Sequence, residues 1–307
     1  MEELKKVEIP VIWHSQQDAR GHYNCTTFIN DIMDSNHCGP HIAGWDGIPK
    51  GTEGAIVIVH GGREEGRFQK LQNDILPLEW VLLIFLGDEE GSFPAEMIEH
   101  PNKVWWVQEP IPGRHDHANR FLIDGYTPKT RKFVTFHKAL VSMGKSKKKD
   151  LDWVFAGQVT HVRRRDCVDA LRTIDWGGVI VETKGYCQGV SIEEYHDLLL
   201  RAKIVPCPSG PCAPDAARAW EALECGAIPI LDEYSPRFQC DGYWTKVLGP
   251  HPLPVIRDWA ALPFRIKELL EDWPAKASEC QRWWESYKAW MKAALALDLY
   301  ELHLRHK

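Results

Sequence analysis

Short apolar runs alternate along the first half of the chain with segments whose apolar residues recur every three or four positions. The apolar runs are PVIWHS, GAIVIVHGG, WVLLIFLGDEEG and NKVWWVQEP, and the segments between them include YNCTTFINDIMDS, RFQKLQNDILP and the short PAEMIEH. Nearly continuous apolar runs of this length are typical of strands buried on both faces, as in a parallel sheet. Because strand–helix–strand crossovers are right-handed, the alternation predicts a doubly wound α/β domain with helices on both faces.

The second half of the chain repeats the alternation. Its predicted strands are DWVFAGQ, GVIVET, KIVPCP and AIPILDEY, and its predicted helices are RRRDCVDALRTI, SIEEYHDLLLRA and DAARAWEALEC. The chain ends in a long helical stretch, in which Trp283, Tyr287, Trp290 and Ala294 are spaced as one packing stripe.

A charged run, MGKSKKKDLDW, lies between the two halves and predicts an exposed linker. We therefore expect an N-terminal Rossmann-like domain over residues 1–145 and a second Rossmann-like domain over residues 151–275. Residues 276–307 are expected to form a C-terminal helix that packs back on the first domain.

The amino-acid composition limits the classes of protein to which the chain could belong. The chain has 307 residues, of which 44% are hydrophobic, and this is enough for two domain cores. A formal net charge of −6 gives no support for non-specific nucleic-acid binding by the whole molecule. Nine scattered cysteines without a CxxC pair predict reduced thiols, no metal site and no tightly bound cofactor. The apolar runs have strand length and the charged start MEELKKVEIP lacks a signal core, so we expect a cytoplasmic protein without a membrane span.

The segment from Cys207 to Tyr234 has the residue types of an anion site. It leaves a strand at the carboxyl edge of the sheet, where parallel sheets bind ligands, and Gly210 lets backbone N–H groups approach a ligand. Asp215 is the expected N-cap of the next helix. Arg218 offers two parallel donors to a phosphate, and Glu221, on the same helical face, suits the hydroxyls of a ribose. The spacing equally fits an ordinary surface ion pair between these two side chains.

Three stretches resemble the exostosin-like (GT47-type) glycosyltransferases. CPSGPCAPDAARAWEALECGAIPIL is similar to the family signature, in which a Pro-Gly loop precedes an Arg-x-x-Glu-Ala-Leu helix, a Gly and an Ile-Pro strand. DWVFAGQVTHVRRRDCVDAL resembles its strand–Gly-x-x-x-Arg–helix unit, and EEYHDLLLRAKIVPCP resembles its helix leading into a Cys-Pro strand. The resemblance implies a GT-B fold, which is α/β with two Rossmann-like domains facing across a cleft. The donor nucleotide sugar would bind the second domain and the acceptor the first.

The resemblance also implies roles for individual residues. Arg218 would bind the diphosphate of a UDP-sugar, Glu221 would bind its ribose, and Arg163 or Arg164 would add a second cation. Many family members carry Arg where this chain has Ser209, so that contact would be missing or supplied by another basic side chain. The full set of implied donor-binding positions is Gly157, Gln158, Arg163, Arg164, Lys184, Pro208, Ser209, Gly210, Arg218 and Glu221.

Glycosyl transfer requires a base for the acceptor hydroxyl and cations or N–H groups for the leaving diphosphate. No Asp-x-Asp follows a strand, so a metal-independent, inverting reaction is expected. Asp88 is the first candidate base, Glu89 the second and His60 a third, because all follow predicted strands; a solvated acidic turn and a structural histidine are the alternatives. The residues expected to line the acceptor pocket, or to form only a polar loop, are Asp18, Arg20 and His22.

Together these patterns predict a glycosyltransferase that moves a sugar from a UDP-sugar to an acceptor hydroxyl in the cytoplasm of a bacterium or a virus-infected host cell. The acceptor is expected to be a glycan or lipid-linked precursor, or 5-hydroxymethylpyrimidine in viral DNA. Two other classes stay open. A dinucleotide-dependent oxidoreductase would fit two Rossmann-like halves, although no G-x-G-x-x-G follows a strand. A non-catalytic protein could retain a nucleotide-sugar pocket.

Overall fold

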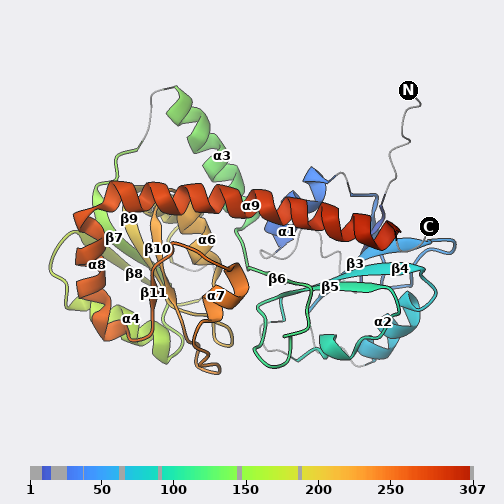
Figure 1. Ribbon diagram of the computed structural model, residues 1–307. Coiled ribbons are helices and arrows are strands. Elements are labelled where there is room, and N and C mark those ends of the chain that lie inside the picture. The colour runs from blue at the N-terminus through green and yellow to red at the C-terminus, as the bar shows by residue number, and fades with distance from the viewer. Residues whose placement is uncertain are drawn as a thin grey trace. The chain divides into compact units, whose positions relative to one another are not determined.

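The computed structural model of the chain consists of two units defined by their internal contacts (Figure 1). The first unit contains Met1–Ile123 and Lys288–Lys307, and the second contains Asp124–Tyr287. The structure describes residues 9–14, 26–36, 38–61, 66–88, 92–143, 147–185 and 189–304.

The described residues of the first unit form a six-stranded, all-parallel sheet with the order β2-β1-β3-β4-β5-β6. Its strands are β1 (Val11–Trp13), β2 (His41–Ala43), β3 (Gly54–His60), β4 (Trp80–Leu86), β5 (Lys103–Gln108) and β6 (Arg120–Leu122). Its helices are α1 (Thr26–Ser35), α2 (Arg67–Ile75) and the 3₁₀ turn η1 (Ala95–Met97), and α9 (Trp273–Leu304) contributes its last residues.

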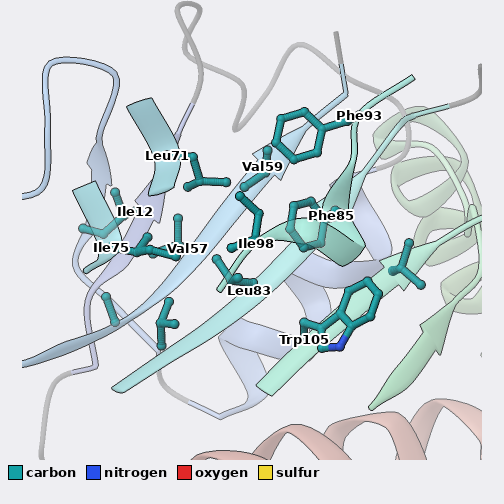
Figure 2. Packing of buried hydrophobic residues seen from close by; sticks show 14 of the residues in the cluster. Ile12, Val57, Val59, Leu71, Ile75, Leu83, Phe85, Phe93, Ile98 and Trp105 are labelled. Carbon is teal, nitrogen blue, oxygen red and sulfur yellow. The ribbon is translucent and has the colours of Figure 1, made fainter. Parts of the chain in front are cut away.

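Both faces of this sheet are covered. On one face, apolar side chains of α2 and of the segment around η1 pack against alternate strand residues, as Figure 2 shows for Leu71, Val57, Phe85 and Ile98. For the other face, Trp106 of β5 donates its indole N–H to Asp298 of α9 at 2.8 Å. Strands that are buried on both faces need continuous apolar sequence, and the runs of β3 and β4 meet that requirement.

The second unit contains a five-stranded, all-parallel sheet with the order β11-β10-β9-β7-β8. The strands are β7 (Leu151–Gln158), β8 (Gly178–Thr183), β9 (Ala202–Cys207), β10 (Ile228–Asp232) and β11 (Val255–Ile256). The helices are α3 (Pro128–Ser142), α4 (Val162–Arg172), α5 (Ile192–Arg201), α6 (Ala217–Glu224), α7 (Tyr243–Leu248), η2 (Trp259–Ala261), α8 (Leu262–Glu271) and the first part of α9. Right-handed crossovers place α4 on one face and α5 to α7 on the other, and α8 packs on α4 (Figure 1).

Each sheet winds in the same way. The chain first steps from one strand to a neighbour on one side, then returns past the first strand and continues on the other side. In the second unit this reversal falls between β7 and β9. Loops at the carboxyl ends of two strands that flank a reversal diverge and leave a crevice, which is where open parallel sheets bind ligands. The predicted α/β architecture, with two parallel sheets and alternating helices, is confirmed.

Several local predictions were incomplete or wrong. The sequence pattern did not predict β2, β6 or α3, and α3 packs with α5 and α6 in the second unit. Two positions of the predicted stripe on α9 are shifted by one residue. Trp284 is fully buried in place of Trp283, and Met291 is fully buried in place of Trp290, which is 48% exposed. The shift follows from the partners, since Trp284 stacks on the buried Trp220 of α6. Tyr287 and Ala294 are buried, as expected.

Candidate functional site

The carboxyl end of β7 is shaped around the side chain of Arg218. A Cβ atom on Gly157 would lie 2.0 Å from Arg218 Nη2, so only glycine leaves room for the guanidinium there. Arg218 Nε donates to the carbonyl of Ala156 at 3.1 Å, and the guanidinium carbon lies 4.8 Å from the centre of the Phe155 ring. Arg218 Nη1 is buried and has no hydrogen-bond partner among the described residues. The arginine is therefore held in place by β7 with one donor unused.

The carboxyl end of β9 contributes Ser209, whose side chain is fully buried. Its hydroxyl has no hydrogen-bond partner within the described ranges. Its carbonyl accepts from His161 Nε2 at 3.1 Å and from Arg164 Nε at 3.2 Å. These two contacts join the loop after β9 to the start of α4, which follows β7.

His161 occupies the N-cap position of α4, but its side chain does not cap the helix. Because a carbonyl oxygen only accepts, the proton of the neutral imidazole lies on Nε2 and Nδ1 carries a lone pair. Nδ1 is buried and has no partner in the described part of the chain. Burial, followed by the positive charge of Arg164, lowers the pKa of His161 to about 4, against the hydrogen bond to Ser209. The imidazole is thus neutral at pH 7 unless a negative charge comes near it.

Three buried polar atoms without partners therefore lie on segments that meet at the reversal of the second sheet: Arg218 Nη1, Ser209 Oγ and His161 Nδ1. Buried polar groups in proteins are almost always hydrogen-bonded, so unpaired ones commonly mark a ligand, ion or water position. The start of α4, which no side chain caps, adds the positive end of the helix dipole. This combination of donors and positive charge is suited to an anion.

Arg163 is differently placed from its neighbour Arg164. Its guanidinium makes a two-point contact with Asp232, through Nε at 3.1 Å and through Nη2, and it also donates to a backbone carbonyl of the loop after β11. Asp232 is fully buried at the end of β10 and accepts from the backbone N–H of Ser209 at 3.2 Å and from Trp259 Nε1 at 3.0 Å. Arg163 and Asp232 thus fix the loop that carries Ser209. The charge of Arg163 is paired with Asp232 and is not a free cation.

Glu221 is 6% exposed and its carboxylate is held by hydroxyl groups. Oε1 accepts from Thr130 at 2.6 Å and from Thr127 at 3.2 Å, and Oε2 accepts from Tyr195 at 2.8 Å. Arg218 and Glu221 share no ion pair, since the contacts of each are to other groups. The alternative of an ordinary surface pair is therefore wrong.

The remaining implied donor positions are less closely assembled. Pro208 is buried, but the N–H of Gly210 is used by the carbonyl of Asp215 at 3.2 Å. Gln158 is half-buried at the end of β7, and Lys184 is exposed after β8. The expected cap also differs: Ala216 is the N-cap of α6, while Asp215 accepts from Trp220 Nε1 and the N–H groups of Ala216 and Asp124.

In the first unit the ends of β3 and β4 bring His60 and Asp88 together. A Cβ on Gly61 would lie 2.6 Å from the Cα of Asp88, and a Cβ on Gly87 would lie 2.6 Å from His60 Nε2. Asp88 accepts from the N–H groups of Ser92 and Phe93 at 2.9 and 2.8 Å, which is a turn-closing arrangement. Burial lowers the pKa of His60 to about 4.

The other candidates of the first unit lie outside the described residues: Glu89, Asp18, Arg20 and His22. Sequence reasoning also missed four residues of the second unit. Two had a usable signal, because His161 precedes a helix that follows a strand and Asp232 ends a strand. Thr130 and Tyr195 had none, since only the tertiary packing of α3 and α5 on α6 brings them to Glu221.

Within the ranges that the structure describes, no helix combines the length and apolar character needed to cross a bilayer. Those same ranges contain no cluster of three His, Cys, Asp or Glu side chains that could hold a metal ion.

No protein-family model matches the chain, and no curated protein sequence matches it. Among solved structures the chain is similar to Anabaena Alr3699/HepE in complex with UDP and glucose, with UDP-glucose, or with UDP. The TM-scores are 0.49, 0.47 and 0.43, at 11% sequence identity over 96% of this chain and 100% of the other. At this identity, TM-scores below 0.5 do not assign a function, which has to be argued from the residues of the site.

Proposed function

We propose that the second unit binds the diphosphate of a UDP-sugar and that the protein is a glycosyltransferase of the exostosin-like type. The observation that carries the proposal is the set of three buried, unpaired polar atoms on Arg218, Ser209 and His161 at the reversal of the sheet. A diphosphate has several strong acceptor oxygens and a negative charge, which is what these groups and the start of α4 would satisfy.

Each of the three side chains contributes a different property. Arg218 supplies a permanent charge that no carboxylate among the described residues neutralises. Ser209 supplies a neutral donor from a loop that Asp232 fixes. His161 becomes a donor through Nδ1 when a phosphate raises its pKa, while its Nε2 stays on Ser209. The site therefore gains positive charge as the anion binds.

The same groups would stabilise the leaving diphosphate during transfer. As the bond between the anomeric carbon and the phosphate oxygen breaks, negative charge grows on that oxygen, and preorganised donors lower the barrier. The acceptor oxygen forms the new bond to the anomeric carbon from the opposite face and loses its proton to a base, in the inverting, metal-independent reaction we expect. We assign the acceptor to the first unit in a GT-B arrangement, with His60 and Asp88 as candidate bases. The acceptor itself is proposed to be a glycan or lipid-linked precursor, or hydroxymethylated DNA.

Calorimetric titration tests the donor site. We expect UDP to bind the wild-type protein and NADH to bind no better than AMP, because a dinucleotide-dependent oxidoreductase would show the reverse. Arg218→Met should weaken UDP binding by about tenfold to a hundredfold, the range for hydrogen bonds to charged groups. Arg165→Met is the matched control, since Arg165 is an exposed residue of α4. Equal UDP affinity in the two variants would contradict the site.

Transfer is tested separately from binding. A panel of UDP-sugars would be incubated with the protein and with glycan or hydroxymethylated-DNA acceptors, and released UDP would be measured. Release with an acceptor would support the enzyme. UDP-sugar binding without release by any acceptor would instead favour the non-catalytic alternative.

A further inference from the structure

Glu221 is connected to a histidine through a single threonine hydroxyl. Thr130 Oγ1 lies 2.6 Å from Glu221 Oε1 and 2.8 Å from His196 Nε2. The other ring nitrogen of His196, Nδ1, lies 2.7 Å from the carbonyl oxygen of Ile192. His196 and Thr130 are both buried, so these contacts are shielded from water.

The protons in this chain can be counted. The Ile192 carbonyl only accepts, so His196 Nδ1 must carry a proton. The hydroxyl of Thr130 has one proton, which can go to Glu221, to His196 or to Thr127 Oγ1 at 2.8 Å, but to only one of them. If it goes to Thr127, then both Glu221 and His196 Nε2 must carry a proton toward Thr130. If it goes to Glu221, then His196 Nε2 must also be protonated. If it goes to His196, then the carboxyl of Glu221 must be protonated. In every case, Glu221 and His196 together hold at least one proton more than an ionised carboxylate and a neutral imidazole would.

Resting on the proposed function, we propose that Thr130 and His196 form a proton-sharing relay with Glu221 that positions Glu221 for the ribose of the donor. Oε2 of Glu221 accepts only from Tyr195 in the described structure, so it keeps a lone pair for a ribose hydroxyl.

An aromatic ring and three titratable groups pack around the relay in the described part of the chain. The ring of Phe133 from α3 stacks on His196 with 4.9 Å between ring centres. Burial raises the pKa of Cys207 and of Cys225 to about 12 and raises the pKa of Tyr195 well above its usual value, so these groups stay neutral at pH 7. The titratable groups that interact with Glu221 from the elements packed around it are Tyr195 of α5, Cys225 after α6 and Cys207 of β9, and the charge of Arg218 of α6 acts on Tyr195 and Cys207.

Binding of UDP and of inorganic pyrophosphate separates the relay from the diphosphate site. Thr130→Val removes the hydroxyl at nearly constant volume, Thr130→Ser retains it, and Thr135→Val on the exposed side of α3 is the matched control. We expect Thr130→Val to lower UDP affinity by about tenfold and to leave pyrophosphate affinity within about twofold. Thr130→Ser and Thr135→Val should behave like the wild type.

The outcomes distinguish the two proposals. If the wild type binds neither UDP nor pyrophosphate, the proposed function fails. If the wild type binds both and Thr130→Val changes neither, the relay is overturned while the donor site stands. Equal losses of both ligands would also overturn the relay, because the variant would then act on the whole site and not on the ribose.

A spectroscopic readout tests the proton itself. Nitrogen NMR of the imidazole should show His196 with a proton on Nδ1, either as the imidazolium or as the neutral Nδ1–H form. A neutral form protonated on Nε2 alone would overturn the relay.

Discussion

Gly157→Ala perturbs the proposed diphosphate site with one methyl group. The added Cβ would lie 2.0 Å from Arg218 Nη2 and 3.1 Å from its Cζ, so the guanidinium has to move. The obstacle is the far end of a flexible side chain, which can move aside. Gly157 also has a φ of +158°, which L residues rarely adopt, so the substitution strains the end of β7 as well, and the thermal stability of the variant has to be measured beside its affinity. Moving Arg218 breaks its bond to the Ala156 carbonyl and takes Nη1 away from the ligand position.

The size of the effect follows from what is lost. One charge-assisted hydrogen bond contributes about 1.5–3 kcal/mol, which corresponds to a roughly tenfold to hundredfold weaker affinity for UDP. The assay is calorimetric titration with UDP, accompanied by thermal unfolding to confirm that the variant is folded. Gly157→Ala in an Arg218→Met background should add little, because both changes remove the same contact. Wild-type UDP affinity in a folded Gly157→Ala protein, or additive losses in the double variant, would refute the reasoning.

Two further predictions concern protons. His161 has a pKa lowered to about 4 in the free protein, and a bound phosphate favours its charged form, so UDP binding should tighten as the pH falls from about 8 to about 6 and should take up a proton. Titrations in buffers of different ionisation enthalpy measure that uptake, and His161→Phe should abolish it; unchanged uptake in the variant would exclude the histidine. Lys149 donates to the carbonyls of Leu199 and Cys225 at the ends of α5 and α6, and burial lowers its pKa from 10.5 to about 8. Between these two values the unfolded chain binds the proton and the folded chain does not, so the free energy of unfolding rises with pH by up to about 3 kcal/mol. Chemical denaturation at several pH values should show that increment in the wild type and not in Lys149→Met, and an equal rise in both proteins would assign it elsewhere.

The parts of the fold that follow from local sequence were predictable. Apart from His60 at the end of β3, the runs of β3 and β4 are apolar at every position because both faces are buried, and this indicates a parallel sheet. The short edge strands β2 and β6 have three residues each and no such run, so their pairing depends on neighbours that the sequence does not identify. The burial of Trp284 in place of Trp283 likewise depends on Trp220, which is more than sixty residues away.

The same distinction applies to the candidate site, where some residues belong to local sequence patterns and the contacts of others depend on tertiary structure. Arg218 and Gly157 could be named as candidates from the sequence because each belongs to a local pattern, a loop entering a helix or a strand ending in glycine. The different contacts of Arg163 and Arg164 could not be predicted. Both residues lie in one basic run, and only the tertiary structure brings Asp232 to the first and the Ser209 carbonyl to the second. Sequence reasoning identifies residue types that suit a ligand, but it does not show which of them the fold has already paired.

A crystal structure of the protein with UDP tests the central claim most directly. The diphosphate oxygens are predicted to lie within hydrogen-bond distance of Arg218 Nη1, Ser209 Oγ and His161 Nδ1, at the carboxyl ends of β7 and β9. A diphosphate bound elsewhere, with those three atoms paired only to water or to other side chains, would contradict it.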